Sequence, residues 1–192
     1  MPMRYFIKSW MFFVWLLVLA SCNKSLHLEE EFACQRSDLK GVLEEVSDFK
    51  KTFSIELPKH WNTKLYYDNF QSEIFTADTI KVLDESYIMA LSMINAKIDV
   101  NNLFKEKVHT VTQSEGLVTV KDGFINFKGN KAYFNFGKGI NNGKELHVFQ
   151  CYVKLHEETY FLVKTEIYGS ENMDARLCES IQIMNSIKFI GL

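Results

Sequence analysis

The hydrophobic period of the chain becomes two in the run Phe53-Ser54-Ile55-Glu56-Leu57-Pro58-Lys59-His60-Trp61. In the first half of this run apolar residues alternate with polar ones, which predicts a β-strand with one buried face. Pro58 has no backbone N–H to donate, so we expect the strand to end there. Between residues 39 and 49, apolar residues recur at three- and four-residue steps, which predicts a short amphipathic helix before this strand.

Further extended and helical segments follow this strand. The extended segments predicted from alternation are residues 64–67, 73–77, 86–97, 117–127 around a turn at 121–123, 132–136, 144–155 and 159–168. Helices are predicted from Asp99 to about Gln113 and, after Ser170, along the last part of the chain. Most links between the extended segments have hairpin length, which indicates antiparallel pairing. Residues 86–97 are apolar on both sides, as is typical of a central strand with helices on each face. The sequence therefore predicts an α+β domain, a central, mostly antiparallel β-sheet flanked by helices on both faces (an α/β/α sandwich).

Two short motifs resemble those of PsbP-like domains. The pattern Phe-x-Ile-x-x-Pro-x-x-Trp is matched by residues 53–61, and Gly129-Asn130-Lys131-Ala132-Tyr133 leads through a hairpin to a closing helix and Ile187. The resemblance covers about residues 50–190. The superfamily includes the photosystem II extrinsic subunit, Ran-binding import factors of the Mog family and DcrB-like bacterial envelope lipoproteins. It implies the sandwich fold and a docking or assembly role, with no catalytic set to carry over.

The beginning of the chain has the pattern of an export signal. Arg4 and Lys8 precede an uninterrupted apolar run at residues 10–20, and no acidic residue comes before Cys22. This run is shorter than the roughly 20 residues that a membrane-spanning helix needs. Leu19-Ala20-Ser21-Cys22 resembles the lipobox of bacterial lipoproteins. The resemblance implies cleavage before Cys22, lipid chains on its sulfur and amine, and anchoring in the bacterial cell envelope at the periplasmic face or in the outer membrane. An ordinary signal peptide with a chance cysteine is the alternative.

These features divide the chain into three parts. Residues 1–21 are predicted to be the lipoprotein signal peptide, and residues 22–36 the lipidated cysteine with a polar tether that carries the acidic run 29–31. Residues 37–192 are predicted to form a single globular domain, since this length supports one hydrophobic core.

Composition and motifs exclude several classes of function. Without its first 21 residues the chain would carry 20 basic against 24 acidic residues, and no basic cluster stands out, so we expect no nucleic-acid partner. No Gly-x-Ser-x-Gly elbow, glycine-rich phosphate loop or His-Glu-x-x-His zinc motif appears, and the five histidines are scattered. We therefore expect no metal ion, no cofactor and no catalytic group.

The chain has four cysteines, and three remain if Cys22 is acylated. Cys34, Cys151 and Cys178 allow three different single disulfides in an oxidising compartment. Cys151 and Cys178 fall in a predicted strand and the last helix, where they could face each other. Free buried cysteines acting as small apolar residues are an equal alternative.

The candidate binding surface consists of aromatic residues that follow the first strand. His60 and Trp61 leave the sheet edge after Pro58, and Tyr66, Tyr67 and Phe70 cluster around the next turn. The functional interpretation is a contact surface for a protein. The alternatives are that Trp61 closes one end of the core and that the other rings pack on the sheet.

Three functions remain open at this level. The first is a non-catalytic lipoprotein that docks a protein partner, and it requires an exposed aromatic patch. The second is a carrier of a small apolar ligand or lipid, which requires a deep cavity. The third, and least favoured, is a hydrolytic enzyme, which requires a cleft with converging titratable residues.

Overall fold

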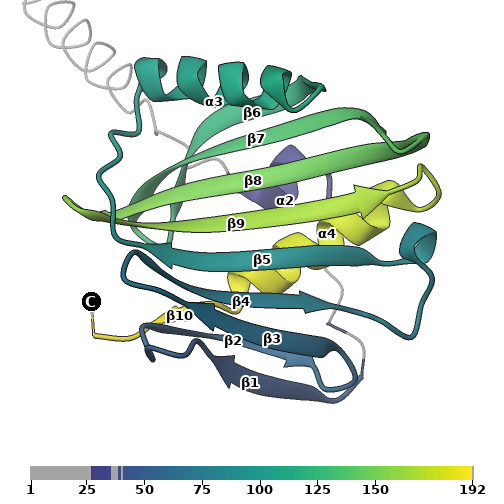
Figure 1. The fold of residues 1–192 in the computed structure, drawn as a ribbon, viewed down its shortest axis with the longest axis horizontal. Coiled ribbons are helices and arrows are strands. Elements are labelled where there is room, and N and C mark those ends of the chain that lie inside the picture. The colour runs from purple at the N-terminus through teal and green to yellow at the C-terminus, as the bar shows by residue number, and fades with distance from the viewer. Residues whose placement is uncertain (1–26, 36–38, 40, 192) are drawn as a thin grey trace, which may run out of the picture.

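The structure is a computed structural model that describes residues 27–35, 39 and 41–191, and its strands form two antiparallel sheets (Figure 1). Cys22 and the lipobox lie outside the described residues. The large sheet has seven strands in the order β3 (Asn62–Tyr67), β4 (Gln71–Ala77), β5 (Tyr87–Ile94), β9 (Thr159–Tyr168), β8 (Lys144–His156), β7 (Asn130–Asn141) and β6 (Leu117–Phe127). The small sheet has three strands in the order β1 (Leu43–Ser47), β2 (Phe53–Pro58) and β10 (Lys188–Phe189).

Short hairpins connect β6 through β9 in a meander. Asn142 and Gly143 both have positive φ, 51° and 77°, in the turn between β7 and β8, as the Asn-Gly hairpin signal predicts. The alternation in residues 144–155 and 159–168 produces two long strands, in which every second side chain is buried along β9. The antiparallel prediction from link length is therefore confirmed for these strands.

The chain has three described α-helices and one short 3₁₀ turn, η1 (Leu83–Glu85). In the view of Figure 1, α2 (Leu28–Glu31) and α4 (Met173–Asn185) lie behind the large sheet, and α3 (Asn102–Ser114) lies along its upper edge. Phe32, just after α2, packs its ring edge to face against Phe134, whereas Phe104 of α3 packs against Tyr133. Neighbouring strand residues point to opposite faces, so α2 and α3 use opposite faces of β7.

Helix cover on the front of the large sheet is limited to one side. Figure 1 shows α3 beside β6 and β7, and no described helix crosses the front of β9, β5, β4 and β3. The front-facing residues Ile88, Ala90 and Ile94 of β5 are accordingly only partly buried. The structure thus has mostly antiparallel sheets with helices, but the expected single sheet with helices across both faces differs from the two sheets and the partial cover observed.

The main core lies between the large sheet, α4 and the small sheet. Phe53, Ile55 and Leu57 of β2 are fully buried. The apolar positions that predicted this strand are therefore also its core positions. On the large sheet, Phe134, Phe149 and other residues of the rear face complete the core. Burial of large aromatic and aliphatic side chains on this scale is the dominant stabilising contribution.

The predicted helix at residues 39–49 is wrong. Residues Leu43–Ser47 form β1, which pairs antiparallel with β2 through partners such as Val46 and Ile55. The spacing of apolar residues allowed a helix, but the exposed edge of β2 supplies hydrogen-bond partners for an extended chain.

The predicted turn at residues 121–123 is also absent, because β6 continues from Leu117 to Phe127 with a register shift between Thr119 and Lys121. Gly123 has a packing role in this strand instead. A Cβ atom at this position would lie 3.0 Å from the ring of Phe134. A glycine in an alternating segment can therefore mark close packing as well as a turn.

Part of the segment expected to be a polar tether packs against the domain. Leu28 is buried and joins the main core, and Phe32 and Cys34 pack against it. The acidic run at residues 29–31 lies between two apolar contacts, made by Leu28 before it and Phe32 after it. From His27 to Gln35 this segment is consequently a component of the globular unit.

Candidate functional site: an aromatic hairpin and an uncovered sheet face

The hairpin between β3 and β4 positions the exposed aromatic residues. Asp68 accepts hydrogen bonds from the backbone N–H groups of Phe70 and Gln71, at 2.7 and 2.8 Å. These two hydrogen bonds favour the carboxylate and lower the pKa of Asp68 below its ordinary value. Lys50 donates from its Nζ atom to the Asp68 carbonyl at 2.6 Å, which ties the β1–β2 turn to this hairpin. The turn is therefore a defined structure and not a loose loop.

Two neighbouring tyrosines of this hairpin point to opposite sides of the sheet. Tyr66 lies 6.5 Å from Phe75, edge to face, and both are on the front of the large sheet. Tyr67 lies on the other side, stacked at 3.9 Å on Phe49 from the β1–β2 turn. Tyr66 is 48% exposed, Tyr67 56% and Phe70 70%, so all three remain accessible to a partner.

His60 and Trp61 do not belong to this exposed group. Trp61 is only 8% exposed and its ring contacts that of Tyr87 at 5.1 Å. It closes the core, which was the alternative interpretation of this residue. His60 lies beside Asp78, with 3.5 Å between Nε2 and Oδ2, at the end of β4 opposite to the Tyr67 turn. The structure thus keeps Tyr66, Tyr67 and Phe70 together and separates His60 and Trp61 from them.

Sequence reasoning missed Phe49 and Phe75 as members of the exposed aromatic group. Phe75 is 37% exposed. In the sequence, its place in the predicted strand at residues 73–77 is the only indication that its ring lies on a sheet face. Phe49 is 55% exposed, whereas the helix predicted for residues 39–49 puts it on the apolar stripe. A correct strand prediction for residues 43–47 would have put Phe49 in a turn, where an exposed ring is noteworthy.

The uncovered front of β3, β4, β5 and β9 is called here the open face. Its partly exposed apolar side chains are Tyr66, Phe75, Ile88, Ala90, Ile94 and Leu162. Two polar pairs lie among them: Ser92 donates to Glu73 at 2.7 Å, and Lys164 lies 2.8 Å from Glu166. Apolar and aromatic surface with paired polar groups is the composition of many protein–protein interfaces.

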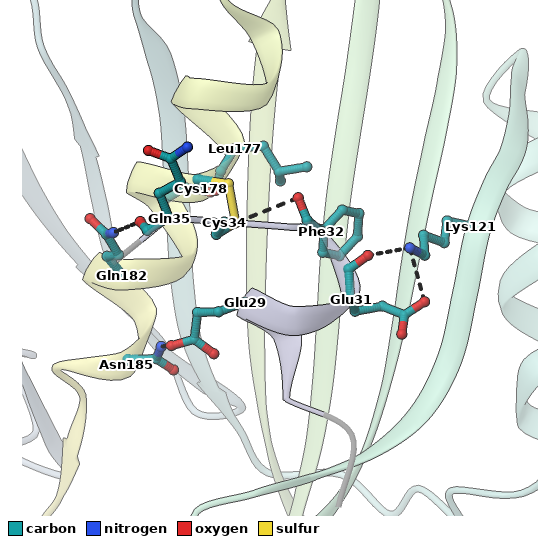
Figure 2. Close-up of a disulfide and its surroundings, with 11 residues drawn as sticks. Glu29, Glu31, Phe32, Cys34, Gln35, Lys121, Leu177, Cys178, Gln182 and Asn185 are labelled. Carbon is teal, nitrogen blue, oxygen red and sulfur yellow. Dashed lines mark hydrogen bonds and ion pairs between the residues drawn. A yellow bond between two sulfur atoms is a disulfide. The ribbon is translucent and has the colours of Figure 1, made fainter. Parts of the chain in front are cut away.

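The N-terminal segment is tied to the back of the domain by several contacts (Figure 2). Cys34 forms a disulfide with Cys178 of α4. Glu31 pairs with Lys121 of β6 at 2.9 Å, and Gln35 accepts from Gln182 at 3.2 Å through its carbonyl oxygen. Of the three disulfides left open by the sequence, the structure has Cys34–Cys178, and Cys151 is a free buried thiol.

A surface cavity of about 630 Å³ marks where this segment enters the domain. Residues 27–29 form one wall, the β6–β7 turn with Phe127, Lys128 and Gly129 forms another, and Asn185 of α4 completes it. Glu29 accepts a hydrogen bond from Asn185 at the same place. The chain thus enters the domain at the end of the sheet where β6 turns into β7.

A cluster of titratable groups lies under α3. Asp122 of β6 lies 2.7 Å from the Nζ atom of Lys105 and accepts from the Tyr133 hydroxyl at 3.2 Å, while His109 is 3.7 Å away. Burial, with a further contribution from Asp122, raises the pKa of Tyr133 far above its ordinary value. This cluster joins α3 to the sheet.

Two further observations concern reactive and metal-binding groups. Burial raises the pKa of the Cys151 thiol well above its ordinary value, so this sulfur is a poor nucleophile. Among residues 27–35, 39 and 41–191, no group of three or more His, Cys, Asp or Glu side chains is arranged to hold a metal ion.

In the same part of the chain, no helix has the length and hydrophobicity to cross a membrane.

No protein-family model and no curated protein sequence matches the chain. Solved structures do match its backbone. Cyanobacterial PsbP (CyanoP) from Synechocystis sp. PCC 6803 has a TM-score of 0.55 at 10% identity, over 81% of this chain and 98% of that chain. The Ran-binding protein Mog1p of Saccharomyces cerevisiae has a TM-score of 0.54 at 8% identity, over 78% and 96%. The fold is PsbP/Mog-like. The expectation of this fold from the motif at residues 53–61 is confirmed, and at these identities the likeness concerns the PsbP/Mog-like fold alone.

Proposed function

We propose that this chain is a lipid-anchored protein of the bacterial cell envelope that docks a protein partner on its open face and has no catalytic activity. The observation that carries the proposal is the uncovered front of β3, β4, β5 and β9. Tyr66 and Phe75 stand exposed on it beside partly exposed aliphatic residues of β5 and β9. An apolar sheet face that the helices of the same protein do not cover is a favourable binding surface for a partner.

Two other observations support this proposal. The Cys34–Cys178 disulfide fits an oxidising compartment such as the envelope. One solved protein with the PsbP/Mog-like fold is described as Ran-binding, so this fold is able to present a surface to another protein. The lipid anchor rests on the lipobox resemblance of residues 19–22.

A carrier function is less well supported by the interior of the domain. A carried apolar molecule needs a hollow between the sheet and α4. Phe53, Phe134 and Phe161 fill this space and are fully buried. The described cavities, such as the one at residues 127–129, open to the surface.

Site-specific photocrosslinking in the native envelope tests the docking surface. A photoreactive phenylalanine analogue at position 75 should capture a defined protein, and Tyr66→Ala should reduce that capture. The matched control position is Ile140, which is 77% exposed at the end of β7 and lies away from the open face. Equal capture from position 140, or none from position 75, would contradict the docking proposal.

The anchor is tested separately by mass spectrometry of the mature N-terminus, which should show diacylglycerol on Cys22. The variant Cys22→Ala should release the domain from membranes without unfolding it. An unmodified Cys22 in the wild-type protein, or a variant that remains on the membrane, would contradict the lipoprotein assignment.

A further inference from the structure

The distance between the proposed lipid and the folded domain is short. The N-terminal segment is held from Leu28 onward, because this side chain is buried in the main core and the segment continues into the disulfide at Cys34. Only six residue steps separate Cys22 from Leu28. At about 3.3–3.6 Å per residue the connection spans at most about 22 Å. The expected tether of residues 22–36 would have allowed more than twice that reach.

The point of attachment lies at one particular end of the large sheet. Leu28 lines the same cavity as the β6–β7 turn and Asn185, the last residue of α4. A row of paired residues crosses the sheet close to this end, running Ala132, Val153, Phe161, Met93, Ser72 and Tyr67. The hairpin with Tyr67 and Phe70 therefore lies at the same end as the entry of the chain. Figure 1 shows these turns along the left side of the sheet.

The exposed side chains at this end have the chemistry of a membrane interface. Phe49, Tyr67 and Phe70, called here the aromatic tip, are each more than half exposed, and the first two are stacked. Aromatic residues are favoured at the boundary between lipid headgroups and acyl chains. Lys51, in the same β1–β2 turn as Phe49, is exposed, and its positive charge offsets the exposed carboxylate of Asp68 between Tyr67 and Phe70. The exposed acidic residues 157 and 158 in the β8–β9 turn disfavour membrane insertion there. The surface suited to a membrane is therefore limited to the aromatic tip.

We propose that the aromatic tip inserts into the headgroup region of the bilayer that carries the Cys22 lipid. The inference rests on the lipid anchor of the proposed function and adds the orientation of the domain. The strands of the large sheet then run away from the membrane, and the open face points sideways, where a partner reaches it. Tyr66 and Tyr67 lie on opposite sides of β3. Tyr66 therefore belongs to the open face, and Tyr67 belongs to the aromatic tip.

The experiment uses the full lipidated protein reconstituted in vesicles of brominated phosphatidylcholine, whose bromine atoms quench nearby tryptophan. Trp61 is the one tryptophan after residue 21, and it is buried, so the parent protein supplies the background. Phe70→Trp should lose about half of its added emission in brominated vesicles relative to unbrominated ones. Ile140→Trp, at the opposite end of the sheet, is the matched control and should lose none.

Three outcomes separate this inference from the proposed function. Quenching at position 70 without quenching at position 140 supports the orientation. Vesicle flotation with no quenching at position 70, or with equal quenching at both positions, overturns the orientation and leaves the anchor intact. Failure of the wild-type protein to float with vesicles overturns the anchor and the orientation together.

Discussion

Cys34 and Cys178 are bonded across a sequence separation of 144 residues, and this bond attaches the segment before the first strand to the last helix. Phe32 lies two residues before the bond and contacts three rings of the large sheet. The segment from Leu28 to Cys34 is thus held by apolar packing and by a covalent link. This arrangement makes the segment a part of the folded domain, with Leu28 in the main core.

Loss of the disulfide should destabilise the domain strongly. Cys34→Ser with Cys178→Ser removes the constraint on a loop of more than 100 residues in the unfolded chain, and we expect a loss of about 4 kcal/mol. Urea denaturation with and without reductant measures it. Cys151→Ala is the control, since it leaves the bond in place and keeps the sensitivity to reductant. Equal stability of the double variant and the oxidised wild type would refute the prediction.

Asp48 organises the β1–β2 turn from a buried position. Its carboxylate accepts from the backbone N–H groups of Lys50, Thr52 and Phe53 at 3.0, 2.6 and 2.9 Å. Asp48→Ala leaves these donors unsatisfied, so we expect a loss of about 3 kcal/mol in the free energy of unfolding. Asp68→Ala removes a similar but exposed arrangement and should cost about 1 kcal/mol. A cost for Asp48→Ala no larger than that of the control would show that water replaces the carboxylate.

Gly139 allows a close approach of two backbone segments at the end of α3. A Cβ atom at this position would lie 2.5 Å from the carbonyl oxygen of Gly116. Gly139→Ala should therefore destabilise the domain by about 3 kcal/mol, because a backbone atom cannot move aside as a side chain can. Lys138→Ala, on the neighbouring exposed position, should change stability by less than about 1 kcal/mol. Thermal unfolding of both variants tests the difference.

His147 should make the stability of the domain depend on pH. Burial lowers the pKa of His147 below its ordinary value of 6.5, against a smaller opposing effect of Glu145. The unfolded chain therefore binds this proton more readily than the folded one, and stability is lost as pH falls below about 6.5 toward the lowered value. His147→Gln should show a smaller loss between pH 7.5 and pH 5 than the wild type.

The control for this pH dependence is His156→Gln, which changes an exposed histidine at the end of β8. Denaturant unfolding at the two pH values is the measurement. A wild-type pH dependence that persists in His147→Gln would assign it to other groups.

The strands of the large sheet were largely predictable, because alternation and turn residues act locally. Residues 53–58 and 159–168 have the predicted bounds, and the Asn-Gly pair at residues 142 and 143 forms the hairpin turn that such a pair favours. The errors come from tertiary contacts. Residues 43–47 became a strand because the edge of β2 was available, and Gly123 lies in a strand because Phe134 needs the space.

The candidate site was only partly predictable for a similar reason. Alternation places Tyr66 and Tyr67 on opposite sides of β3, but the uncovered side is known only once the helices are placed. Trp61 and Tyr66 lie close in sequence, and packing against Tyr87 buries the first of them. No local signal distinguishes a ring that fills the core from one that remains on the surface.

The Cys34–Cys178 bond also governs how the protein responds to proteolysis. A protease that cuts the chain between Cys34 and β1 separates the N-terminal segment from the rest of the sequence. The two pieces nevertheless stay joined through α4, so a domain anchored at Cys22 would remain on its membrane after the cut. Release of the domain from such an anchor would then require both cleavage and reduction, and an oxidising compartment disfavours the reduction.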